Sequence, residues 1–154
     1  MASNKLQAKI NIKNKKAKFE YEIGDTYVCG IVLKGTEIKS LRQNKASISE
    51  GYCGFDANEL FARNLHIAEY DKASFENHEA KRARKLLLNR TELNKIHKAV
   101  KVKGVTIVPL RLFINEKGLA KLEIGIAAGK KLHDKRQDLK EKDAKRDMDR
   151  AMKR

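Results

Sequence analysis

Hydrophobic and polar residues alternate along several short stretches of the chain, which is the pattern of β-strands that bury one face. The clearest example is a β-hairpin in which two alternating runs flank the turn-forming residues 115–118. A turn is also expected at Gly24-Asp25, between two further alternating runs. The expected strands are residues 19–23, 27–33, 60–67, 106–114 and 120–126, with weaker candidates at 36–41 and 46–52.

Helical spacing replaces this alternation roughly between residues 79 and 101. Asn89 followed by Glu92 matches the N-cap and third helical position of a capping box. The basic run RARKLLL at residues 82–88 is expected to form a short basic helix ahead of that cap. The apolar residues that follow the cap at helical spacing are Leu93, Ile96 and Val100.

These elements favour a mainly β fold, a small OB-like closed barrel with a short helical insert and a helix-prone basic C-terminal tail. Pro109 cannot donate a ladder hydrogen bond, so its strand is expected at a sheet edge or beside a bulge. A chain of 154 residues has room for one domain of ordinary size. We expect that domain over residues 1–129 and a tail over residues 130–154.

Composition argues against a membrane-spanning, secreted or disulfide-stabilised protein. The longest apolar runs fall far short of the roughly 18–20 residues of a membrane span, and the first residues lack the apolar stretch of a signal peptide. The two cysteines, Cys29 and Cys53, are too few for a disulfide scaffold or, alone, for a structural zinc site. A cytoplasmic protein with reduced, buried cysteines and no membrane partner is therefore expected.

Charge is the most informative part of the composition. Lys and Arg number 35 against 20 Asp and Glu, giving a formal net charge of +15 and a pI of about 9.9, which is typical of nucleic-acid-binding domains. Residues 130–154 hold 11 basic, 6 acidic and only six hydrophobic residues. Such a segment cannot bury enough apolar surface to offset its ordering entropy, although its composition favours helix. We expect a tail that is disordered when free and helical when a partner holds it.

The familiar catalytic and cofactor motifs are missing from the sequence. The four histidines lie far apart, no phosphate-binding glycine motif or nucleophile elbow is present, and acidic residues are interleaved with basic ones. Residues 51–54 match the bare GxxG of a KH loop but lack its basic, helical setting. No catalytic residue, metal ligand, cofactor or small-molecule substrate is therefore expected, and an RNA-modifying or RNA-cleaving enzyme is the weakest alternative.

Clusters of basic residues point instead to RNA. They lie at residues 14–18, 39–42, 81–85 and 130–131, and each cluster alone is more readily explained as a solvated face. Together with the basic tail they favour binding to phosphates with salt-dependent affinity. Structured RNA fits better than duplex DNA, because no recognition helix is evident. A structural ribosomal or rRNA-assembly protein stays open as the alternative.

Four segments occur in an order and at a spacing shared with a known family. They are NKKA at residues 14–17, GTEIKSLR at 35–42, RKLLLN at 84–89 and GKKLHDKR at 129–136. On these segments the chain resembles the SmpB family, the bacterial SsrA-binding proteins, from about residue 9 to the C-terminus. It departs from the family pattern at Val28, where a Glu is expected, and at Ala80, where a Pro is common.

The resemblance implies an OB-like barrel with added helices and a role in trans-translation. A protein of this family binds the tRNA-like domain of tmRNA at its D-loop elbow. It delivers tmRNA, with elongation factor Tu joined through the alanyl-tmRNA complex, to 70S ribosomes stalled without a usable stop codon. The tail would lie as a helix in the empty mRNA channel and contact rRNA near the decoding centre, so that the absence of message is what is sensed.

The basic clusters and the resemblance together assign residues to these contacts. One leucine of the basic helix, Leu87, is expected to stack on a base while its two neighbours pack inward. Glu37 is expected to support the fold or to orient a lysine rather than to meet phosphate. The residues expected to contact tmRNA are Asn14, Lys15, Lys16, Lys39, Arg84, Lys85, Leu87 and Asn89. Those expected at the ribosome and its decoding centre are Lys130, Lys131, His133, Asp134, Lys135, Arg136, Lys140, Lys145, Arg146, Arg150, Met152 and Lys153.

Overall fold

A computed structural model describes residues 10–73, 76–129 and 132–152. The strands in these residues are β1 (Asn11–Lys13), β2 (Tyr21–Ile31), β3 (Ala46–Ser47), β4 (Tyr52–Asp56), β5 (Glu59–Arg63), β6 (His66–Ile67), β7 (Arg84–Leu87), β8 (Val105–Ile114) and β9 (Ala120–Gly129). The helices are α2 (Lys15–Glu20), α3 (Gly35–Arg42), α4 (Arg90–Val100) and α5 (Leu132–Met152). The expected mainly β fold with short helices and a C-terminal helix is therefore confirmed.

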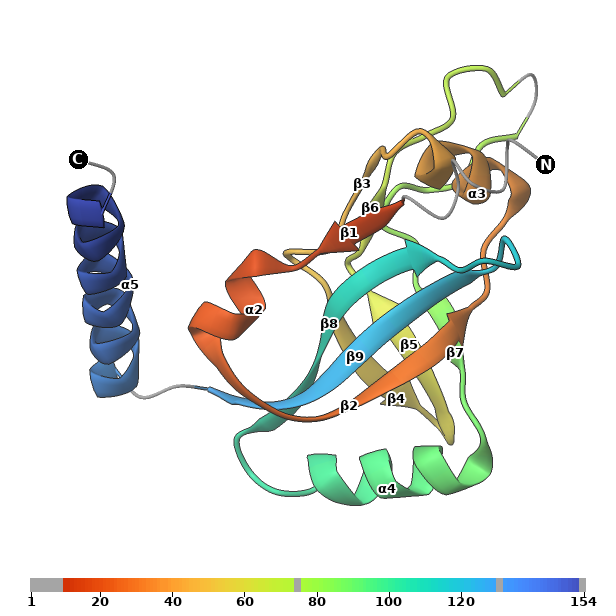
Figure 1. The fold of residues 1–154 in the computed structure, drawn as a ribbon. Coiled ribbons are helices and arrows are strands. Elements are labelled where there is room, and N and C mark those ends of the chain that lie inside the picture. Colours follow the sequence, from red (N-terminus) through yellow and green to blue (C-terminus); the bar gives the residue numbers. More distant parts are fainter. Residues whose placement is uncertain (1–9, 74–75, 130–131, 153–154) are drawn as a thin grey trace.

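Six strands pair side by side into a closed ring. Their order is β8-β4-β5-β7-β2-β9, and β9 pairs with β8 to close the ring. Every neighbouring pair is antiparallel. The short strand β1 adds to β8 beyond the point where β8 pairs with β4. Figure 1 shows α4 across one end of this ring and α3 at the other, while α2 lies between β1 and β2.

The core fills the interior of the ring because alternate residues of each strand point inward. On the β8–β9 hairpin, the inward residues Leu112, Leu122 and Ile124 are all fully buried. Two helices close the ends with one fully buried hydrophobic side chain each, Leu41 from α3 and Ile96 from α4. One continuous hydrophobic cluster thus joins the strands of the ring to α3 and α4.

Several local predictions agree with the structure. The hairpin strands pair from Val105 opposite Ala128 to Ile114 opposite Ala120, and a bulge follows Pro109. Asn89 caps α4, since its side-chain oxygen accepts a hydrogen bond of 2.9 Å from the backbone N–H of Glu92. Of the helices in the described part of the chain, none is long and apolar enough to cross a membrane.

Both cysteines are free and buried in the core cluster, as expected. Burial raises the pKa of the Cys29 thiol to about 12 and raises that of Cys53 as well. The thiolate is the reactive form, so both groups are held in the unreactive thiol state.

Two segments form the opposite kind of element from the one predicted. Residues 36–41, a weak strand candidate, form most of helix α3, because Glu37 accepts a 2.8 Å hydrogen bond from the backbone N–H of Lys34 and closes the first turn. Conversely, the basic run at 82–88 contains strand β7 rather than a helix. Backbone pairing with β5 and β2 on its two sides selects the strand, and a run of three leucines fits either period.

The turn expected at Gly24-Asp25 is also absent. Strand β2 continues through these residues as one strand, and the register with β9 shifts between Ile23 and Thr26. The alternation of polar and apolar residues is interrupted here because a bulge changes the face that a side chain occupies without ending the strand. Phe19, expected in the first of those halves, belongs to helix α2.

Candidate nucleic-acid interface

Leu87 lies on the outside of the ring, at the centre of an exposed apolar surface. Alternation along β7 buries Arg84 and Leu86 while it leaves 53% of Leu87 exposed. Opposite Leu87 on β2 stands Gly30, where an added Cβ would lie only 3.2 Å from the Cβ of Leu87. A glycine at this position therefore lets the leucine lie flat on the sheet. The prediction that Leu87 is outside the core is confirmed, although the element is a strand.

Other aliphatic residues widen this surface, which we call the leucine shelf and define by Leu87, Val28, Val32 and Leu119. Each of the other three is 45–54% exposed. A hollow of about 220 Å³ beside Leu87 is lined also by Leu119 and Lys121. A flat apolar surface with a cation at its rim is suited to a nucleobase with its phosphate.

Lys85 borders the shelf and pairs with Glu59 across β7 and β5, with 2.9 Å between Nζ and Oε1. Both side chains are about half exposed. Exposed pairs of this kind contribute little stability and are screened by salt. The Lys85 ammonium can therefore exchange its carboxylate partner for a phosphate at small cost.

Arg84, also predicted to contact tmRNA, has no exposed surface. Its Nε donates to Oε2 of Glu37, and its two terminal nitrogens donate to the carbonyls of Leu65 and Ala80 at 2.7 and 3.1 Å. Arg82 donates to the other carboxylate oxygen of Glu37 at 2.6 Å. Arg84 thus ties β7 to α3, and its buried guanidinium cannot contact RNA directly.

Glu37 holds two arginines at once, which supports the expectation that it serves the fold. Burial alone would raise the pKa of its carboxyl group, but hydrogen bonds from Arg82, from the Lys34 backbone and from Arg84 outweigh that effect. The pKa of Glu37 is therefore held below its ordinary value. The carboxylate stays charged near neutral pH and fixes the segment that carries the leucine shelf.

Asn14 is used for the fold as well. It caps α2, where its side-chain oxygen accepts from the Ala17 N–H at 3.2 Å, and its side-chain nitrogen donates to the Pro109 carbonyl at 2.8 Å. Only 8% of the residue is exposed. Replacing Asn14 would thus remove a cap and a buried hydrogen bond together, and any effect on RNA binding would include that loss.

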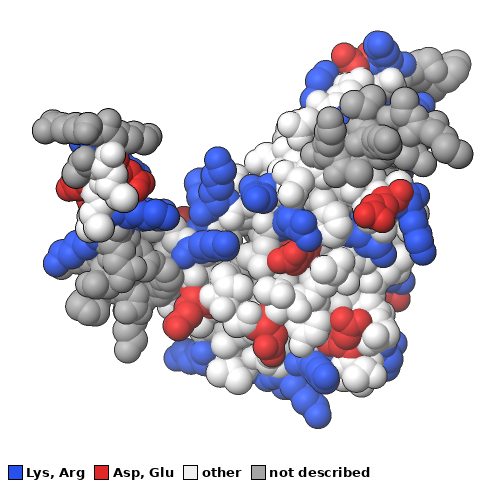
Figure 2. All heavy atoms as spheres, viewed as in Figure 1, with Lys and Arg blue, Asp and Glu red and all other residues white. Residues whose placement is uncertain are grey.

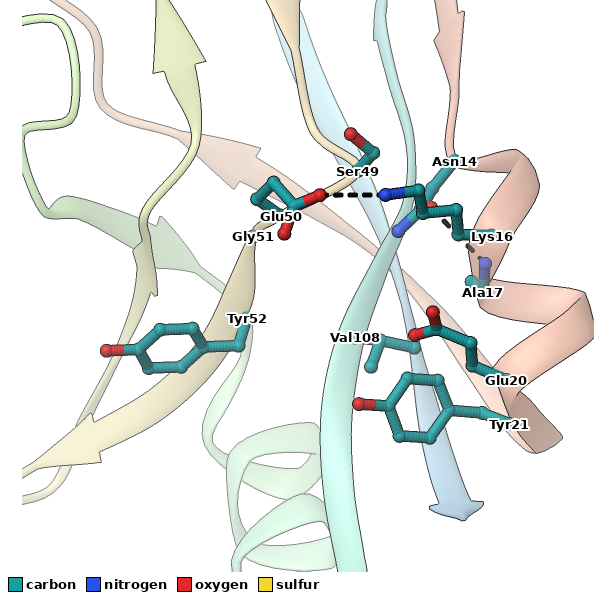
Figure 3. A pocket seen from close by; sticks show the side chains of 10 residues that line it. All are labelled: Asn14, Lys16, Ala17, Glu20, Tyr21, Ser49, Glu50, Gly51, Tyr52 and Val108. Carbon is teal, nitrogen blue, oxygen red and sulfur yellow. Dashed lines mark hydrogen bonds and ion pairs between the residues drawn. The ribbon is translucent and has the colours of Figure 1, made fainter. Parts of the chain in front are cut away.

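An open pocket of about 170 Å³ lies beside this cap, between α2 and the start of β4. Figure 3 shows Lys16 reaching across it to Glu50, with Nζ and Oε1 2.9 Å apart. Tyr21 and Tyr52 lie on either side of Val108 at the pocket wall. The pair of Lys16 and Glu50 is mostly exposed, so that this lysine too is available to a phosphate.

The remaining predicted tmRNA contacts are distributed over other elements. Lys15 is exposed on α2, Asn89 is exposed at the start of α4, and Lys39 is exposed on α3, where its Nζ lies 5.5 Å from the centre of the Tyr70 ring. In Figure 1, α2 and β7 lie on different sides of the ring. The eight residues therefore do not form one patch. Figure 2 shows Lys and Arg side chains gathered over α2 and β1.

The predicted ribosome contacts fall on or beside α5. Lys130, Lys131 and Lys153 lie outside the described residues, and His133, Asp134, Lys135 and Arg136 lie on the first turns of the helix. Lys140, Lys145, Arg146, Arg150 and Met152 are exposed further along it. Helix α5 contacts α2, where Lys142 Nζ lies 5.8 Å from the centre of the Phe19 ring. The helical form agrees with the expectation, while coupling of helix formation to binding stays a prediction.

A ring of strands with an exposed leucine shelf, basic clusters on its outer elements and a basic C-terminal helix defines the class: a small nucleic-acid-binding β protein. In the part of the chain that the structure describes, no cluster of His, Cys, Asp and Glu could hold a metal ion.

Known proteins place the chain within this class. Residues 11–154 match the family described as SmpB protein. The SsrA-binding protein of Phocaeicola vulgatus is 61% identical over 94% of this chain and 97% of its own, and that of Flavobacterium johnsoniae is 59% identical over 94% and 95%. A solved structure described as "tmRNA-SmpB: a journey to the center of the bacterial ribosome" matches with a TM-score of 0.68 and 45% identity, over 80% of this chain and 86% of that one. The chain belongs to the SmpB family.

Proposed function

We propose that this protein binds the tRNA-like domain of tmRNA and delivers it to stalled 70S ribosomes for trans-translation, together with elongation factor Tu on the alanyl-tmRNA. Family membership and relatives named SsrA-binding protein support the choice of RNA. The exposed Leu87, lying flat against Gly30 beside a lysine, is the observation that carries a binding role rather than catalysis. The D-loop elbow of tmRNA is the proposed occupant of the leucine shelf.

The two parts of the chain take separate roles in this proposal. The ring of strands holds tmRNA through the shelf, Lys85 and the lysines of α2. The tail enters the empty mRNA channel as helix α5, where His133 stacks on a base and its basic neighbours hold phosphates near the decoding centre. A message still occupying the channel excludes the tail, so that only ribosomes without message downstream accept tmRNA.

A competition titration tests the choice of partner. The purified protein is titrated against tmRNA of its own organism, with an equally long structured RNA as competitor, at two salt concentrations. We expect tight tmRNA binding that survives the competitor, because electrostatic attraction alone fades with salt and shows no preference. Equal affinity for both RNAs would favour the alternative, a structural ribosomal or rRNA-assembly protein.

Replacing Leu87 with Ala should weaken tmRNA binding by about 10-fold, since covering an exposed leucine side chain with a base buries apolar surface worth roughly 1.5–3 kcal/mol. Thermal stability should change little, because exposed positions usually contribute within about 0.5 kcal/mol. Val102→Ala, which trims a side chain that is 61% exposed in the loop between α4 and β8, is the matched control and should bind as wild type. Leu86→Ala should instead destabilise the fold by about 2–5 kcal/mol. Wild-type affinity for Leu87→Ala would remove the shelf from the interface.

A further inference from the structure

A β-bulge in β8 changes what the outer face of the ring presents. Pro109 stands opposite Ile124, whereas Arg111 stands opposite Glu123, so Leu110 is the extra residue. Val108, before the bulge, and Leu110, within it, pack on the outer face against Ala17 of α2. A bulge re-aims the side chain that follows it. Arg111 thereby lies on the outer face, outside the cluster that packs against α2.

The side chain of Arg111 is held flat by two neighbours on that face. Its guanidinium carbon lies 4.0 Å from the centre of the Phe113 ring, and a terminal nitrogen lies 3.1 Å from Oε2 of Glu123. The Arg111 side chain remains 35% exposed. A planar cation that is already stacked on a ring and fixed at one edge loses little conformational entropy on binding. Such an arrangement is suited to stacking a further planar group.

This pair is continuous with the leucine shelf. Cross-strand partners form a row in which Leu87 faces Gly30, Gly30 faces Lys121, and Lys121 faces Phe113. Three strand spacings separate the two ends of the row, a distance of about 14 Å. Lys13, exposed on β1, stands opposite Arg111 in the adjoining row. A strand of RNA leaving the shelf along this row would meet cations at successive strands.

We propose that Arg111, stacked on Phe113, is a second RNA contact, on which a base of the bound tmRNA stacks while Lys13 and Lys121 meet the flanking phosphates. The inference rests on the proposed tmRNA binding and extends it from β7 across β2 and β9 to β8. Three cations face one carboxylate on this surface, and that carboxylate already binds Arg111. This charge balance favours a polyanion over an apolar protein partner, and the planar guanidinium stacked on the Phe113 ring favours the bases of RNA over an acidic protein.

Four variants of the full chain test the contact by tmRNA titration. Arg111→Ala removes the cation and the stack, and should lower the affinity about 10-fold. Arg111→Lys keeps the charge without the planar group, and Phe113→Leu keeps the bulk without the ring. Both variants should bind tmRNA several-fold more weakly than wild type. Lys95→Ala, which removes an exposed cation from α4, is the control for net charge and should retain nearly full affinity. Circular dichroism melts confirm that each variant is folded.

The outcomes separate this inference from the proposed function. If the wild-type protein fails to prefer tmRNA over the competitor RNA, the proposed function itself is wrong. If it does prefer tmRNA and Arg111→Ala binds equally well, only the second contact is refuted. A loss in Arg111→Ala with full affinity in Arg111→Lys would mean that a charge alone acts there, which overturns the stacked contact.

Discussion

Deleting residues 135–154 should abolish rescue of stalled ribosomes and leave tmRNA affinity within a few fold of wild type. This is the expected result because, among the described residues, helix α5 supplies none of the side chains in the two hydrophobic clusters. The ring that carries the leucine shelf therefore folds without it. The measurements are tagging of a nascent chain in a reconstituted translation reaction on a message without a stop codon, and tmRNA binding by titration.

A second readout checks the sensing role of the tail. Messages that extend progressively further beyond the stalled codon should reduce tagging by the wild-type protein, because RNA in the channel competes with α5. A shuffled tail of the same composition is the control for charge, and it should fail to restore rescue. A large drop in tmRNA affinity on truncation would contradict the separation of roles between ring and tail.

Replacing Glu37 with Ala should lower the free energy of unfolding by about 3–5 kcal/mol, because it leaves a buried arginine without its countercharge. Arg84 has no exposed surface and cannot recover the lost partner from water. Urea unfolding followed by circular dichroism measures the effect. Glu59→Ala, which breaks the exposed pair with Lys85, is the matched control and should cost no more than about 1 kcal/mol. A similar small cost for both variants would contradict the role given to Glu37.

The same carboxylate makes stability depend on pH in a defined direction. The pKa of Glu37 is lower in the folded protein than its ordinary value of 4.5, so its contribution is fully present above that value. The contribution is lost as the pH falls below 4.5 and through the folded pKa. Wild type should thus lose more stability than Glu37→Gln between neutral and acid pH. Parallel stability curves for the two proteins would exclude this linkage.

The sequence by itself determined the features that depend on short-range periodicity and on motifs. Alternation identified the hairpin of β8 and β9, the Asn89 and Glu92 spacing identified the start of α4, and the low apolar content after Gly129 separated the tail from the core. The four shared segments indicated the family. Each of these signals is local, since a strand, a cap or a motif is specified by residues within a few positions of one another.

Only the tertiary structure decided the roles of individual site residues. Arg84 and Leu87 belong to the same basic run. Arg84 is buried and paired with a carboxylate 47 positions away, whereas Leu87 is exposed to solvent and lies opposite a glycine on β2. Arg111 joins the outer face through a bulge whose register is set by β9. Burial, countercharge and register arise from partners distant in sequence. Alternation along a strand separates its two faces, but the partners decide which of the two faces points into the ring.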